Sequence, residues 1–171
     1  SVALAGAIGA MAGVLTAVMA LRSVNEVTHF TTATAALSSH LMYAFFSMVM
    51  FGSIYYIMPR LLQKEWPSAV LINAHFWSSA LGIVWYLASL YLGGWNQGAQ
   101  LNDPANHAEF LPIIESLKPY LVSGTLASIL IGVGHVAFAI SFAWMLAKRR
   151  SAVESSPTLF NTPPSLQAKT T

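Results

Sequence analysis

The chain has 171 residues, of which 56% are hydrophobic and only 8% are charged, and its mean hydropathy is +0.60. A charged share this far below the roughly 25% of soluble domains excludes an ordinary water-soluble fold and favours a membrane protein. The net charge of +2 is too small to indicate nucleic-acid binding, and the lack of cysteine excludes disulfides, thiolate metal sites and c-type heme attachment.

Four segments without Lys, Arg, Asp or Glu divide the chain, and each contains enough apolar residues to cross a bilayer. Because lipid cannot satisfy open sheet edges, we expect an all-α membrane domain over residues 1–147. The Ser/Thr/Pro-rich segment 148–171 is expected to be a polar, mobile cytoplasmic tail. The four predicted transmembrane spans are Val2–Leu21, Ala36–Met58, Leu71–Trp95 and Tyr120–Ala147.

Basic residues are distributed unevenly between the two sides of these spans. If the amino terminus lies on one side, the loop 59–69 and the carboxyl-terminal tail lie there too. The loops 22–35 and 96–118, on the opposite side, contain two basic and four acidic residues. By the positive-inside rule, both termini are therefore expected in the cytoplasm. The basic residues that carry this prediction are Arg60, Lys64, Lys148, Arg149 and Arg150.

Two further segments have distinctive patterns. Within the predicted periplasmic loop, "EFLPIIESL" places apolar residues at helical spacing, which predicts a short amphipathic helix that caps the bundle. The chain opens at Ser1 and enters an apolar segment without a basic region, which is typical of neither a signal peptide nor an ordinary start. We therefore expect a processed chain or a piece of a longer one.

Four of the five histidines have ordinary interpretations. His29 and His107 fall at the edges of spans or outside them, where an imidazole meets water. His75, in "NAHFW", is expected to be an interfacial, hydrogen-bonding residue. His135 lies inside the fourth span, and a neutral histidine bonded to a neighbouring helix is a more frequent arrangement there than a ligand.

The fifth, His40, stands in a stretch that resembles a known family. "THFTTATAALSSHLMYAFFSMVMFGSIYYIMPRLLQKEWPSAVLINAHFW" is similar to the tenth helix and following loop of subunit I of the cbb-type cytochrome c oxidases, the C family of heme–copper oxidases. The similarity continues through "LGIVWYLASLYLGGWNQG" and more loosely through "LKPYLVSGTLASILIGVG". It implies the last four helices of a twelve-helix subunit, a place in the bacterial inner membrane and a role in aerobic respiration. The nitric oxide reductase large subunit is a poorer match.

In that family the tenth helix carries a His-x-His pair whose members bind a high-spin and a low-spin heme. Positions i and i+2 of a helix point about 200° apart, so each can face a different neighbour. Here the three positions read Ser38, Ser39 and His40. The resemblance implies that His40 is an axial ligand of a low-spin heme b, through Nε2, with Nδ1 hydrogen-bonded. The Ser38 hydroxyl is a poor ligand for the other heme.

Aromatic residues within two turns of His40 could pack around a porphyrin, although aromatic residues at helical spacing are more often plain core. They are Tyr43, Phe45 and Phe46. The family's copper ligands, its active-site tyrosine and the second ligand of the low-spin heme come from other helices. The chain is therefore expected to hold no copper site and no catalytic residue, and to be inactive alone.

Two functional interpretations remain open. The chain is either a redox part, completed by partner chains of a respiratory membrane complex that share the heme, or a structural subunit that kept the packing surface and lost its ligands. In the second case His40 is a relic. A small transporter is a weaker third interpretation, because no span pairs opposite charges or breaks at a proline in mid-membrane.

Overall fold

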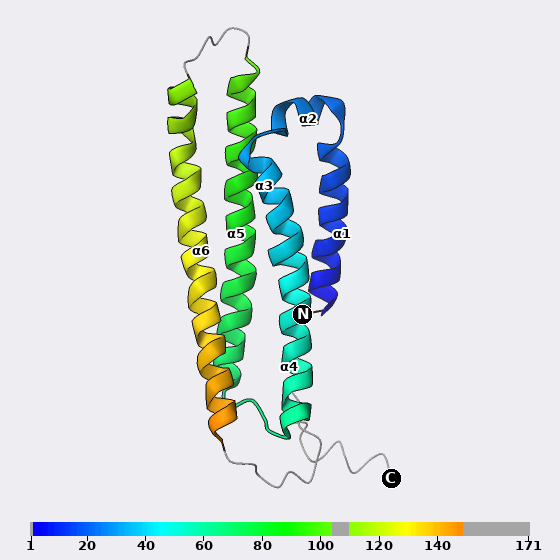
Figure 1. Cartoon of the computed structure of the whole chain (residues 1–171), viewed down its shortest axis with the longest axis vertical. Coiled ribbons are helices and arrows are strands. Elements are labelled where there is room, and N and C mark those ends of the chain that lie inside the picture. Colours follow the sequence, from blue (N-terminus) through cyan, green and yellow to red (C-terminus); the bar gives the residue numbers. More distant parts are fainter. Residues whose placement is uncertain (1, 104–109, 149–171) are drawn as a thin grey trace.

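The computed structural model describes residues 2–103 and 110–148, and the described residues form helices and short connections without a strand (Figure 1). The predicted all-α class is confirmed. Most of the predicted tail lies outside the described residues. The elements are α1 (Val2–Met19), α2 (Arg22–Thr28), α3 (Thr32–Ser39), the π-helix η1 (His40–Ser47), α4 (Met48–Leu62), α5 (Ala69–Leu101) and α6 (Phe110–Ala147).

Three continuous helices are long and apolar enough to cross a membrane: Thr32–Leu62, which joins α3, η1 and α4, and then α5 and α6. The pair α1 and α2, bent by 97°, provides a fourth span if the two helices count as one. Figure 1 shows that α5 and α6 lie side by side along their length, that α3, η1 and α4 run beside α5, and that α2 lies across one end of the bundle.

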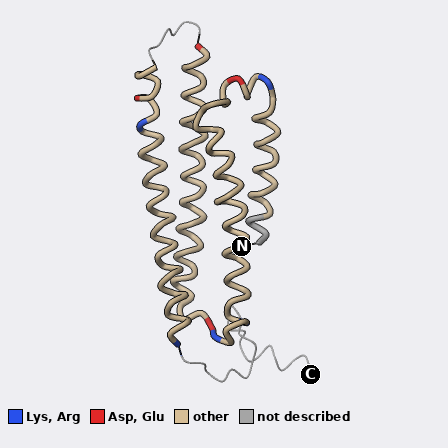
Figure 2. The backbone as a smooth tube through the Cα atoms, in the orientation of Figure 1, with Lys and Arg blue, Asp and Glu red and all other residues tan. Residues whose placement is uncertain are grey.

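Charged residues gather at the two ends of the bundle and leave its middle free of charge (Figure 2). One end contains the connection between α4 and α5 and the carboxyl end of α6, where Lys64 Nζ donates a hydrogen bond to the Leu146 carbonyl at 2.7 Å. The other end contains α2 and the beginning of α6. Such a charge-free middle is what a hydrocarbon layer about 30 Å thick requires.

The predicted short helix in the loop before the fourth span is wrong. The structure has one helix, α6, that begins at Phe110 and continues through Pro119 to Ala147. Its first turns pack on α5: Ile113 and Leu117 are buried, and the Ser116 hydroxyl accepts a hydrogen bond from Gln100 Nε2 at 2.9 Å. These contacts stabilise the helix well beyond the apolar segment, so α6 has 38 residues and a length of about 57 Å at 1.5 Å per residue.

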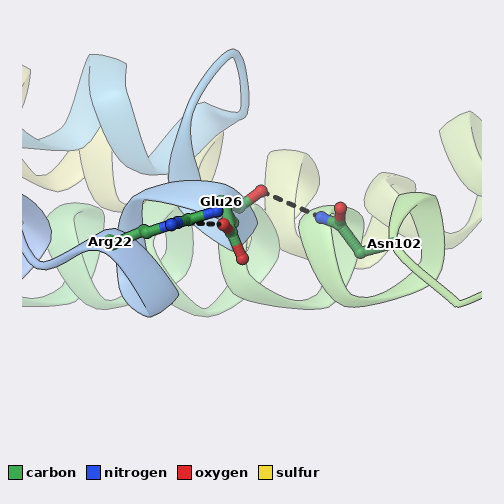
Figure 3. Close-up of polar contacts among 3 residues, drawn as sticks. All are labelled: Arg22, Glu26 and Asn102. Carbon is green, nitrogen blue, oxygen red and sulfur yellow. Dashed lines mark hydrogen bonds and ion pairs between the residues drawn. The ribbon is translucent and has the colours of Figure 1, made fainter.

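Two glycines of α5 allow the chain around α2 and α3 to approach it closely. A Cβ on Gly98 would collide with the Val27 carbonyl oxygen, and one on Gly94 would collide with the backbone of Ala33. A hydrogen bond from Asn102 Nδ2 to the Glu26 carbonyl, at 2.9 Å, fixes α2 to the end of α5 (Figure 3). Within α2 the Glu26 carboxylate pairs with Arg22 at 3.1 Å, an exposed contact that contributes little.

Candidate functional site

His40 lies at the junction of α3 and η1, in the middle of the long helix Thr32–Leu62. Its backbone N–H contacts the carbonyl oxygens of both Ala36 and Leu37, and the eight residues from His40 to Ser47 follow with π-helical hydrogen bonding. Such π-helical segments are rare and occur frequently at functional sites. The irregular backbone therefore marks the same residue that the sequence pattern indicates.

The two ring nitrogens of His40 have different environments. Nδ1 lies 3.4 Å from the hydroxyl of Tyr91 in α5, a long hydrogen bond. Nε2 is buried and has no hydrogen-bond partner, although the backbone of Ile8 in α1 lies near the imidazole. A bonded Nδ1 with a free Nε2 is the arrangement that a metal-binding imidazole needs. The donor atom therefore fits a heme iron.

The space beside Nε2 does not fit a heme. His40 is 1% exposed, and the adjoining cavity has a volume of about 40 Å³. That is close to the ~30 Å³ which one water molecule occupies in the liquid, and a porphyrin is many times larger. Helices α1 and α5 close the cavity with apolar side chains, among them Ile8, Met11, Ile83 and Leu87. With the helices in these positions, no porphyrin can reach the imidazole.

Ser38 lies on a different face of the same helix, as the spacing predicts. Its side chain is exposed, and its hydroxyl is 3.5 Å from the Thr34 carbonyl. It borders a hollow of about 410 Å³ on the outside of the bundle. The residues that line this outer hollow are Ser38, Ser39, Met42, Tyr43, Phe46 and Ser47.

The aromatic residues near His40 do not gather around its imidazole. Tyr43 and Phe46 line the outer hollow, away from the His40 ring. Phe45 instead contacts α1, where a Cβ on Gly9 would meet its ring at 2.7 Å. The three aromatic side chains thus belong to two different surfaces of the helix.

A buried histidine cluster, which the sequence analysis did not predict, lies between α4, α5 and α6. His75 is 1% exposed, its Nδ1 is hydrogen-bonded to the Tyr55 hydroxyl, and its ring centroid lies 5.3 Å from that of His135. Phe51 and Phe138 pack against the His75 ring, with centroid distances of 4.5 and 5.0 Å. The fourfold spacing of Phe51 and Tyr55 places them on one helix face, but only the packing of three helices brings this face to His75.

Two expectations for the other histidines need correction. His75 makes the expected hydrogen bond but is buried rather than interfacial. His135 bonds to its own helix, not to a neighbouring one: Nδ1 donates to the Ile131 carbonyl at 2.8 Å, and the side chain is exposed. His29 is exposed, as expected, and stacks edge-on against Phe30. His107 lies outside the described residues. No group of three or more His, Asp or Glu side chains with metal-binding geometry occurs in 2–103 and 110–148.

Long apolar helices packed side by side, with charges confined to the two ends, define an integral membrane protein of the helical-bundle class. The model of the family "Cytochrome C and Quinol oxidase polypeptide I" matches residues 1–130, so the chain belongs to this family. The likeness to subunit I of the cbb-type oxidases, which the sequence pattern predicts, is therefore confirmed.

Individual relatives support the same assignment. The chain is 30% identical over 133 residues to the cbb3-type cytochrome c oxidase subunit CcoN1 of Stutzerimonas stutzeri, a match that covers 75% of this chain and 26% of that protein. It is 29% identical over 117 residues to a cytochrome c oxidase subunit 1 homolog of Agrobacterium tumefaciens (strain T37), with 66% and 22% covered. The chain thus spans about a quarter of the length of these relatives.

Proposed function

We propose that the chain is a structural, helix-packing part of a cbb-type respiratory oxidase in a bacterial inner membrane, corresponding to the carboxyl-terminal helices of subunit I. Membership of the family and the match to about a quarter of its relatives support this proposal. Other subunits of the complex, among them the polypeptide that carries the remaining helices of subunit I, are its partners. Both termini of the four-helix domain 1–147 face the cytoplasm, as the five basic residues at one end favour.

The observation that carries the structural interpretation is the enclosure of His40 by its own chain. Its imidazole is 1% exposed, and α1 and α5 leave about 40 Å³ beside it. A buried histidine that bonds weakly to Tyr91 and otherwise contacts aliphatic side chains fits a packing role. On this proposal the chain contributes no catalytic residue and no axial ligand.

One observation favours a second function, in which His40 is an axial ligand of a low-spin heme b shared with partner chains. Its buried Nε2 has no hydrogen-bond partner, while Nδ1 has Tyr91. The heme would supply one-electron transfer. This function requires α1 to lie elsewhere in the assembled complex, since Ile8 and Met11 now fill the space beside the ring.

His40→Leu separates the two functions. The oxidised-minus-reduced optical spectrum of the purified complex is expected to keep its low-spin b-type band, normalised to the amount of assembled complex, because leucine replaces a packing residue with one of similar size. Tyr91→Phe is the matched control, since it removes the same hydrogen bond without touching the imidazole. Loss of the b-type band in His40→Leu alone would establish the heme-ligand function instead.

A further inference from the structure

A second hollow adjoins the outer hollow at Tyr43 and extends it across three helices. It has a volume of about 280 Å³, and its lining residues come from η1, α5 and α6: Tyr43, Tyr86, Ser128, Ile131, Gly132 and His135. We call the two connected hollows the lateral groove. The groove is open on the side of the bundle, and Tyr86 lies close to the middle of the 33-residue helix α5. It therefore lies at membrane depth.

The lateral groove contains hydrogen-bonding atoms that the bundle itself does not use. The Tyr43 and Tyr86 hydroxyls make no hydrogen bond within the described part of the chain, where Tyr43 is 51% exposed. His135 uses Nδ1 on the Ile131 carbonyl, which fixes the proton of a neutral ring on Nδ1 and leaves Nε2 as an acceptor. Unpaired polar groups that face hydrocarbon cost several kcal/mol each. The free chain is therefore poorly matched to lipid on this side.

The shape of the groove suits a closely approaching helix. At Gly132 a Cβ would meet no atom within 4 Å, so the surface of α6 is open there. Helices in membranes associate through small residues that admit a neighbouring backbone and through hydrogen bonds between polar side chains. Gly132 supplies the first feature, and the two tyrosines with His135 supply the second.

We propose that a transmembrane helix from the part of subunit I outside these 171 residues fills the lateral groove. This inference rests on the proposed function. The relatives are about four times as long as the matched segment, so the complex contains further helices of the required kind. The helix presents a side chain with both donor and acceptor capacity, such as Asn, Gln, Ser or Thr. This side chain accepts from a tyrosine hydroxyl and donates to Nε2 of His135.

A leucine at Gly132 tests the groove directly. In membranes that contain the full chain and the complex, Gly132→Leu should reduce co-isolation of the remaining subunit I helices at least tenfold, because the side chain occupies the space of the partner helix. Gly13→Leu in α1 is the matched control, since a Cβ there also meets no atom within 4 Å and Gly13 lies outside the groove. Equal chain levels in the membrane and equal helix content by circular dichroism confirm that both variants insert.

The outcomes distinguish the groove from the proposed function. Equal co-isolation by Gly132→Leu and the unchanged chain would overturn the groove alone, whereas no co-isolation by the unchanged chain would overturn the proposed function. A photoreactive phenylalanine analogue at position 43 supplies an independent readout. The expected adduct is a peptide from another subunit I helix. Adducts formed only with lipid or with a small membrane-soluble molecule would show a different occupant and contradict the proposal.

Discussion

His75→Ala is expected to lower the free energy of unfolding by about 3–5 kcal/mol. The substitution removes a fully buried ring between three helices, and large-to-small changes of this kind leave a cavity that the surroundings fill only in part. It also leaves the Tyr55 hydroxyl buried without its partner, which by itself costs about 1–3 kcal/mol. The packing of Phe51 and Phe138 on the lost ring weakens as well.

His135→Ala is the control for this prediction, because that side chain is exposed and bonds only to its own helix. Its expected cost is below about 1 kcal/mol. Thermal unfolding in mild detergent, followed by circular dichroism, measures both variants. If His75→Ala unfolds at the temperature of the unchanged chain, or no earlier than His135→Ala, the cluster does not hold α4, α5 and α6 together.

Gly98→Ala is expected to detach α2 from α5. The added Cβ has no space, because it would overlap the Val27 carbonyl oxygen, a backbone atom that cannot rotate away. Overpacking of this kind costs about 1–3 kcal/mol or more. The hydrogen bond from Asn102 to the Glu26 carbonyl, one turn further along α5, is expected to break with it.

Gly132→Ala provides the matched comparison for Gly98→Ala. Its Cβ meets no atom within 4 Å, and alanine favours a helix over glycine by about 1 kcal/mol, so its stability should stay equal or rise. Backbone amide hydrogen exchange of α2 and of the last turns of α5 measures the local effect. Unchanged protection of both segments in Gly98→Ala would show that the close approach at this glycine is unimportant.

The sequence pattern predicts the helices well but not their lengths. Segments free of charge identify the apolar centres of Thr32–Leu62, α5 and α6, because charge is what a hydrocarbon layer excludes. Uncharged polar residues do not end a helix, however, and side chains such as Asn96 and Gln100 continue α5 while they bond to Ser116 of α6. The π-helix after His40 also has no signal in the sequence, since it depends on backbone hydrogen bonds.

The candidate site shows the same division between local and tertiary information. Helical spacing alone separates Ser38 from His40 on the helix surface, and the structure places them on different faces. The enclosure of His40 by α1 and the contact of His75 with Tyr55 join residues of different helices. Such contacts depend on how helices pack against one another, and a periodicity within one helix contains no information about them.

The most direct test of the account is the size and composition of the particle that contains this chain. Affinity isolation in a mild detergent, followed by native mass determination and peptide identification, should recover the chain with the remaining helices of subunit I. The particle should be several times larger than the 18.4 kDa of the chain itself. A monodisperse, stably folded 18.4 kDa monomer, recovered without those helices, would contradict the claim that the chain packs as part of an oxidase subunit.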